Sequence, residues 1–86
     1  MNYDVTTNFK RKYKKKIQIA QKSIDDTIEL LIDNPHHPGL HTHKVQGTTK
    51  IFEAYINDEA RLTFEYVENS IIFRTNCNHN TVLKNP

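Results

Sequence analysis

The residues best suited to chemistry in this 86-residue chain are its five histidines and its single cysteine. Four histidines fall within eight residues, and the fifth comes two positions after the cysteine: His36, His37, His41 and His43, then Cys77 and His79. Imidazole and thiolate groups bind zinc, and imidazole also transfers protons near neutral pH. The spacings are not those of a structural zinc site and no paired cysteine motif exists, so we expect no metal and no cofactor.

A second candidate site is a run of basic residues near the N-terminus. Between Lys10 and Lys22 there are seven Lys or Arg residues and no acid, whereas the rest of the chain has five basic and ten acidic residues. The net charge of +2 hides this asymmetry. With Tyr13 inside it, the run is a candidate phosphate-binding surface. The alternative is a solvated helix face beside an acidic helix, and charge alone does not decide between them.

Length and composition exclude several classes of protein. A chain of this length predicts one domain, residues 1–86. The single cysteine rules out an internal disulfide framework and fits a reducing compartment. No window approaches the roughly 18 apolar residues of a membrane span, and the N-terminus has no stretch typical of a signal peptide. We therefore expect a soluble cytoplasmic protein with no membrane partner. No Gly-rich phosphate loop, nucleophile elbow or paired-carboxylate motif is present.

The elements that position these residues follow from hydrophobic spacing. Residues 2–5 fit a short edge strand, and the side chains of residues 6–8 are good helix N-caps. Apolar residues then recur at helical spacing, namely Phe9 and Tyr13, followed by Ile17, Ala20, Ile24, Ile28, Leu31 and Ile32. Asn34-Pro35 ends the series because proline disfavours the helical conformation in the residue before it. The pattern predicts a helical hairpin, or one bent helix, over residues 8–33.

The second half of the chain predicts a loop followed by strands. Residues 36–50 look like a loop, with turn signals at Pro38-Gly39 and Gly47. Three runs, 51–56, 60–66 and 70–75, are rich in aromatic and β-branched residues and are joined by short polar connections. Their alternation separates an apolar face from a face with charged and aromatic groups, among them Glu53, Tyr55, Arg61, Thr63 and Glu65. We expect the helices to cover the apolar face.

The order of these segments resembles the RelE/ParE superfamily of toxins from type II toxin–antitoxin systems, closest to its RelE-like and YafQ-like branches. Short segments carry the resemblance along nearly the whole chain: Phe9…Tyr13-Lys14-Lys15, Ile28-Glu29-Leu30-Leu31, Asn34-Pro35, Leu40 to Gly47, Glu53 to Asn57, Arg61 to Phe64, and His79 to Pro86. Their order and spacing matter more than any one motif. The resemblance implies an α+β fold in which an N-terminal strand and a two-helix hairpin pack on a small antiparallel sheet of three to four strands.

The resemblance also implies an activity, the metal-independent cleavage of mRNA in the ribosomal A site. The ribose 2′-hydroxyl attacks the adjacent phosphorus, leaving a 2′,3′-cyclic phosphate and a free 5′-hydroxyl. Such a reaction needs a base, an acid and a cation that stabilises the charge growing on phosphorus. The implied partners are a cognate antitoxin, the ribosome and mRNA.

Roles in this reaction carry over residue by residue. The resemblance implies His43 as the base or phosphate-orienting group and His79 as the general acid; the alternatives are a turn-capping loop histidine and an exposed C-terminal one. Arg61 and Arg74 would hold the scissile phosphate through paired N–H donors. The alternative for both arginines is a cross-strand ion pair with a glutamate, Glu53 or Glu65.

Further residues have weaker assignments. Tyr55 would stack on a base or orient the phosphate, unless it is an ordinary surface tyrosine. Glu59 is a weak base candidate and otherwise a hairpin-turn acid. Contacts with ribosomal RNA phosphates are expected from a set of lysines, Lys10, Lys12, Lys14, Lys15 and Lys44.

Two other functions are compatible with the same fold. A ParE-like toxin that binds DNA gyrase needs neither His43 nor His79. A degenerate module would bind its antitoxin without catalysis. Asn80, which stands where the family has an acid, and the modest net charge keep this last alternative open.

Overall fold

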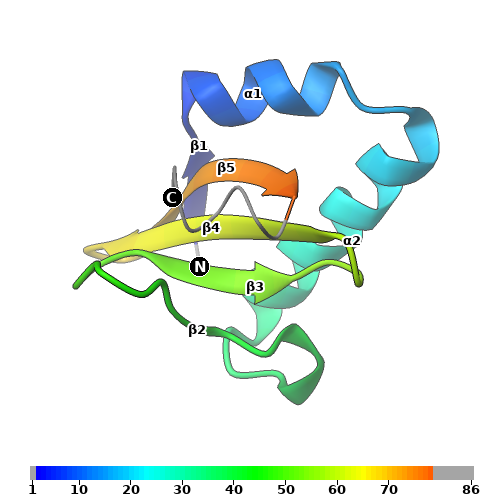
Figure 1. Cartoon of the computed structure of the whole chain (residues 1–86). Coiled ribbons are helices and arrows are strands. Elements are labelled where there is room, and N and C mark those ends of the chain that lie inside the picture. Colours follow the sequence, from blue (N-terminus) through cyan, green and yellow to red (C-terminus); the bar gives the residue numbers. More distant parts are fainter. Residues whose placement is uncertain (1, 79–86) are drawn as a thin grey trace.

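A computed structural model describes residues 2–78 of the chain (Figure 1). The elements follow the predicted order of strand, two helices and a series of strands. They are β1 (Asn2–Val5), α1 (Thr7–Lys14), α2 (Gln18–Asp33), the 3₁₀ turn η1 (Pro38–Leu40), β2 (His43–Lys44), β3 (Phe52–Tyr55), β4 (Ala60–Val67) and β5 (Ser70–Asn78).

The strands form one five-stranded sheet in the order β1-β5-β4-β3-β2. β1 runs parallel to β5, and the other neighbours are antiparallel. The predicted α+β fold is confirmed, with β1 as an edge strand. The loop predicted over residues 36–50 is interrupted by η1 and by β2. This second edge strand forms because Val45 donates its N–H to the Ile51 carbonyl at 2.8 Å, across a turn in which Gly47 has φ +85°.

Helix α1 begins at the predicted cap and is tied to β5. The Thr6 hydroxyl accepts the Phe9 N–H at 3.1 Å and donates to the Arg74 carbonyl at 2.7 Å. Because one hydroxyl serves both elements, the cap also fixes where the helix starts above the sheet. Phe9 is buried and its ring lies 5.8 Å from that of Phe73.

Both helices pack against one face of the sheet, with α2 behind it and α1 above it in Figure 1. The main core lies between them, and nine of its residues are buried: Phe9, Ile24, Leu31, Leu40, Ala54, Leu62, Phe64, Ile71 and Phe73. α2 ends at Asp33, and Asn34 is extended with φ −153°, as the proline after it predicted.

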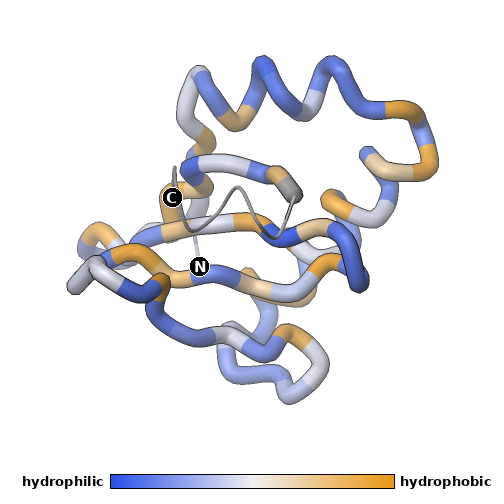
Figure 2. The backbone as a smooth tube through the Cα atoms, in the orientation of Figure 1, coloured by the Kyte–Doolittle hydropathy of each residue, from blue (hydrophilic) through white to orange (hydrophobic). Residues whose placement is uncertain are grey.

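The apolar stripe expected along the second helix is wrong at its start. Ile17, the first residue of the predicted stripe, is 71% exposed. Ile17 precedes α2 as its cap residue, at the corner where the chain turns away from α1, so it lies outside the helical period. Figure 2 shows this corner as an apolar segment beside the hydrophilic α1. Within residues 2–78, neither helix has the length and apolar character needed to cross a bilayer.

Candidate functional site on the open face of the sheet

The face of the sheet turned away from α2, here called the open face, carries two rows of polar side chains. Strand register aligns the first row, His43, Glu53, Thr63 and Thr75, and the second, Tyr55, Arg61 and Cys77. Side chains at directly paired positions share a face and lie roughly 5 Å apart. The rows are therefore adjacent, and we call them the glutamate row and the arginine row.

The glutamate row is centred on an ion pair between His43 and Glu53. His43 Nε2 lies 2.7 Å from Glu53 Oε1, and Nδ1 lies 2.8 Å from the carbonyl oxygen of His41. A carbonyl oxygen only accepts, so Nδ1 is the donor in that contact, while Nε2 faces the Glu53 carboxyl group. The Glu53 side chain is 7% exposed and that of His43 58%. The Glu53 carboxyl group and the His41 carbonyl together hold the imidazole at both of its ring nitrogens.

The arginine row is a stack of flat groups. The Arg61 guanidinium carbon lies 4.8 Å from the centre of the Tyr55 ring, and the His41 ring meets the same ring edge-on at 5.6 Å. Arg61 Nη1 also donates to the carbonyl oxygens of Asn57 and Ala60. The Tyr55 hydroxyl donates to Asp58 at 2.8 Å, and this hydrogen bond raises the pKa of Tyr55. The phenol is therefore a fixed neutral donor.

Cys77 is the last member of the arginine row, and it forms a small second apolar cluster with Val45 and Ile51. Burial raises the pKa of the Cys77 thiol, while the charges of Lys12 and Lys16 act in the opposite direction. Helix α1 lies beside β5, since the Asn76 side chain donates to the Phe9 carbonyl at 3.1 Å.

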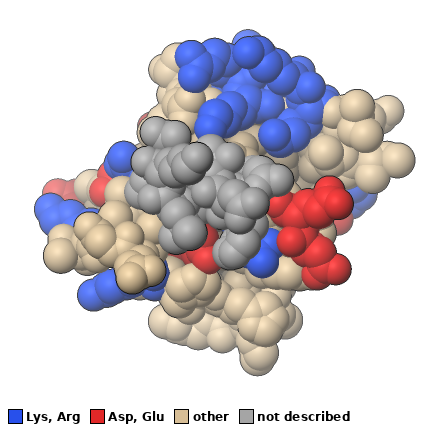
Figure 3. Space-filling model, in the orientation of Figure 1, with Lys and Arg blue, Asp and Glu red and all other residues tan. Residues whose placement is uncertain are grey.

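The basic run forms a continuous cationic surface over α1, on the side of the molecule that Figure 3 presents. Lys10, Lys14 and Lys15 are exposed and Lys12 is half-buried. Lys44 lies on β2, at the opposite edge of the sheet from α1 and β5. The five predicted RNA-binding lysines thus divide into an α1 group of four and one separate residue.

The other predicted site residues lie apart from the two rows. Arg74 Nη1 is 3.4 Å from Glu65 Oε1, so the ion pair weighed as an alternative is present for Arg74, whereas among residues 2–78 Arg61 forms none with Glu53 or Glu65. Glu59 is exposed in the turn between β3 and β4, where its N–H bonds to the Asn57 side chain at 2.9 Å. His79 lies outside the described residues.

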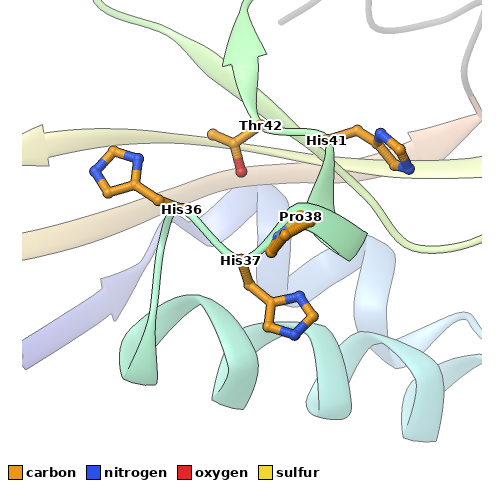
Figure 4. A pocket seen from close by; sticks show the side chains of 5 residues that line it. All are labelled: His36, His37, Pro38, His41 and Thr42. Atoms are coloured by element: carbon orange, nitrogen blue, oxygen red, sulfur yellow. The ribbon is translucent and has the colours of Figure 1, made fainter.

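The histidine cluster does not converge. His36, His37 and His41 line a hollow of about 220 Å³ with Pro38 and Thr42, and Figure 4 shows the three rings pointing in different directions. His37 is committed locally, since its Nδ1 accepts the Gly39 N–H at 3.1 Å. Among residues 2–78, no group of three or more His, Cys, Asp or Glu side chains is arranged to hold a metal ion.

Two residues of this site had no role in the sequence analysis. His41 was one of four loop histidines, and Glu53 was only a possible partner for an arginine. The alternation of side chains along a strand could have indicated both residues. His41 is two positions from His43, and Glu53 was predicted on the polar face of the sheet. What local spacing could not supply was the register that pairs β2 with β3.

No protein-family model and no curated protein matches the sequence. Solved structures share the fold. YafQ from E. coli strain BL21(DE3) has a TM-score of 0.74 and 17% identity, covering 94% of this chain and 96% of that one. The YoeB/ParE toxin from Agrobacterium tumefaciens has a TM-score of 0.79 and 14% identity, over 92% and 99% of the two chains. YafQ in the E. coli DinJ–YafQ toxin–antitoxin complex has a TM-score of 0.73 and 17% identity, over 93% of each. The chain therefore has the fold that the sequence resemblance implied.

Proposed function

We propose that this protein is the toxin of a type II toxin–antitoxin system, a metal-independent endoribonuclease that cleaves ribosome-bound mRNA. The observation that carries the proposal is the open face, where the imidazole of His43 on β2 and the guanidinium of Arg61 on β4 lie on the two strands that flank β3, while the cationic α1 packs against β5. The fold shared with YafQ and with a YoeB/ParE toxin supports it.

Arg61 is the group best placed to hold the scissile phosphate. Its carbonyl contacts and its stacking on Tyr55 fix the plane of the guanidinium, while its remaining N–H donors stay available. A fixed guanidinium offers two parallel donors to phosphate oxygens and stabilises the charge that grows on phosphorus. Tyr55 presents an aromatic surface on which a base could stack. Arg74, already paired with Glu65, is a weaker candidate for this role.

The imidazoles lie close to this phosphate position. His43, on β2, is two strands from Arg61, about 10 Å across the sheet. Both of its ring nitrogens already have partners, the His41 carbonyl and Glu53, so His43 would orient a phosphate oxygen only by exchanging or sharing its Nε2 contact with Glu53. His79 remains the proposed general acid for the 5′ oxygen. The α1 lysines would bind ribosomal RNA phosphates and raise affinity without base specificity.

The proposed partner is an acidic antitoxin, by analogy with the DinJ–YafQ toxin–antitoxin complex. The cationic α1 and the exposed edges of β1 and β2 offer docking surfaces for a helical or extended segment. The proposed site of action is the cytoplasm, where the ribosomes are.

Controlled expression in a bacterial host tests the proposal. Wild-type protein should arrest growth and translation, with transcript ends mapping inside codons. Arg61→Ala should relieve toxicity and still bind the antitoxin, whereas Lys50→Ala, an exposed charge off the open face, should stay toxic. Intact mRNA with DNA-damage signalling would favour the gyrase-binding alternative. Well-folded protein without any growth effect would favour a module that binds antitoxin and has no catalytic activity.

A further inference from the structure

We propose that His41 is the general base that accepts the 2′-hydroxyl proton, and that His43 is a positioning residue whose ring is held by Glu53 and by the His41 carbonyl. The assignment rests on the proposed nuclease function and deepens it. It follows from a contrast between two imidazoles that are two residues apart in sequence and lie at the same corner of the open face.

His43 is poorly suited to accept a proton. Its Nδ1 hydrogen is directed at the His41 carbonyl at 2.8 Å, and its Nε2 faces the Glu53 carboxylate at 2.7 Å. A base needs a ring nitrogen whose lone pair can reach the substrate. For His43 to act as the base, one of these contacts would have to break.

His41 has the opposite character. Its side chain is exposed, and its ring touches the Tyr55 ring edge-on at 5.6 Å. No hydrogen bond joins its ring nitrogens to another of residues 2–78. Because Tyr55 is stacked under Arg61, the ring lies next to the proposed phosphate position. Imidazole as a class exchanges protons near neutral pH.

The other groups of the two rows are unsuitable as bases. Arg61 stays protonated. The Tyr55 hydroxyl already donates to Asp58, and this hydrogen bond raises the pKa of Tyr55. Burial raises the pKa of the Cys77 thiol. Both side chains therefore hold their protons. Glu53 is engaged with His43. Among these described residues on or beside the open face, His41 is the one that can take a proton without losing a hydrogen bond or an ion pair.

The backbone conformation of His41 fixes the direction of its side chain. It is left-handed, with φ 47° and ψ 43°, a conformation that residues with a Cβ adopt uncommonly. The 3₁₀ turn before it imposes this conformation, and the His41 N–H bonds to the Pro38 carbonyl at 3.3 Å. Strain of this kind concentrates at functional sites. Here it places the ring against Tyr55, away from His36 and His37.

In the proposed step one phosphorus–oxygen bond forms and another breaks. A neutral His41 nitrogen takes the proton of the 2′-hydroxyl while the 2′ oxygen forms its bond to phosphorus. The bond from phosphorus to the 5′ oxygen breaks, and that oxygen leaves with its electron pair and takes a proton from the general acid. Arg61 donates hydrogen bonds to the non-bridging oxygens. The products are a 2′,3′-cyclic phosphate and a free 5′-hydroxyl.

The test is single-turnover cleavage of mRNA on programmed ribosomes. His41→Asn removes the imidazole but keeps a residue that tolerates the left-handed backbone. We expect this variant to cleave about 100- to 10,000-fold more slowly than wild type, the usual range for a lost general base. His36→Ala, from the same loop, should cleave at the wild-type rate. Added free imidazole should partly restore His41→Gly, which a merely structural role would not allow.

The outcomes separate this assignment from the function on which it rests. A His41→Asn variant that cleaves as fast as wild type, or a slow His41→Gly variant that imidazole does not restore, would overturn the base assignment and leave the nuclease proposal intact. Wild-type protein that leaves ribosome-bound mRNA uncut would overturn both. Unchanged thermal unfolding of His41→Asn provides the folding control.

Discussion

The two faces of the sheet use the same strands for different purposes. Along β4, Leu62 and Phe64 are fully buried under the helices, while Arg61 and Glu65, on the open face, are half-buried. Antiparallel sheets with one covered face ordinarily leave the other to solvent. Here the second face is itself partly enclosed, since Glu53 is 5% exposed. One alternating pattern therefore builds an apolar core on one side and a protected polar patch on the other.

The enclosure of the open face matters for its chemistry. Buried polar groups need hydrogen-bond partners, and charges interact more strongly where water is excluded. Glu53 has such a partner in His43, and the Tyr55 hydroxyl has one in Asp58. The helix face is stabilised mainly by apolar packing, whereas the open face depends on specific polar pairs. Substitutions on the two faces should consequently affect different measurements.

The largest expected effect is on the helix face. Phe64→Ala removes a fully buried ring that contacts the rings of Phe52, Tyr66 and Phe73. We expect the free energy of unfolding to fall by about 3–5 kcal/mol, measured by urea denaturation, because a cavity is left in the core. The neighbouring Arg61→Ala, on the other face, should change stability by less than about 1 kcal/mol. Equal losses would contradict the division between the faces.

A smaller effect is expected from the polar pair. Glu53→Gln keeps the shape of the side chain and removes its charge, so His43 loses the partner that fixes its ring. We expect single-turnover cleavage to slow by roughly 10- to 100-fold, the range known for groups that orient a functional histidine. The free energy of unfolding should change by only about 1 kcal/mol, because His43 is largely exposed.

A double-mutant cycle distinguishes orientation from an independent role. If Glu53 acts through His43, the double variant Glu53→Gln/His43→Ala should cleave no more slowly than His43→Ala alone. Independent multiplication of the two losses would show that Glu53 acts on the substrate or the fold by another route.

Much of this architecture follows from local sequence. The Thr6 cap, the helix end before Pro35, and the faces of β3 and β4 were predicted correctly because each depends on neighbouring residues or on a simple period. Ile17 was placed wrongly because apolar spacing does not reveal where a chain turns. β2 was missed because two residues, His43 and Lys44, have no period to detect.

The site was less predictable than the fold, since it depends on which strands become neighbours. The sequence identified Arg61, Tyr55 and His43 as candidates through the family resemblance. It could not show that Glu53 pairs with His43, nor that Arg74 pairs with Glu65 across a register shift between Thr63 and Phe64. Both pairs follow from strand register, which joins residues distant in sequence. The assignment of His79 stays a prediction.

The smallest expected effect is a loss of stability at alkaline pH, which tests whether side chains on the open face are shielded from water. Burial raises the pKa of Cys77 above the ordinary value of 9.0, so the folded protein holds this proton more tightly than the unfolded chain does. The resulting stability is fully present below pH 9.0 and is lost as the pH rises through the raised value. Tyr13, Tyr55 and Tyr66 add a similar loss starting from 10.0.

Cys77→Ala isolates the first part of this loss. Urea denaturation at a series of pH values from neutral to alkaline should give a wild-type stability that begins to fall near pH 9.0, and a variant curve that stays flatter until the tyrosines titrate. The comparison uses the slopes, because the missing sulfur also changes the absolute stability of the variant. Identical slopes would mean that the thiol is as accessible to water in the folded protein as in the unfolded chain. In that case the open face would be an ordinary solvated surface, and the contrast with the helix face would be one of composition alone.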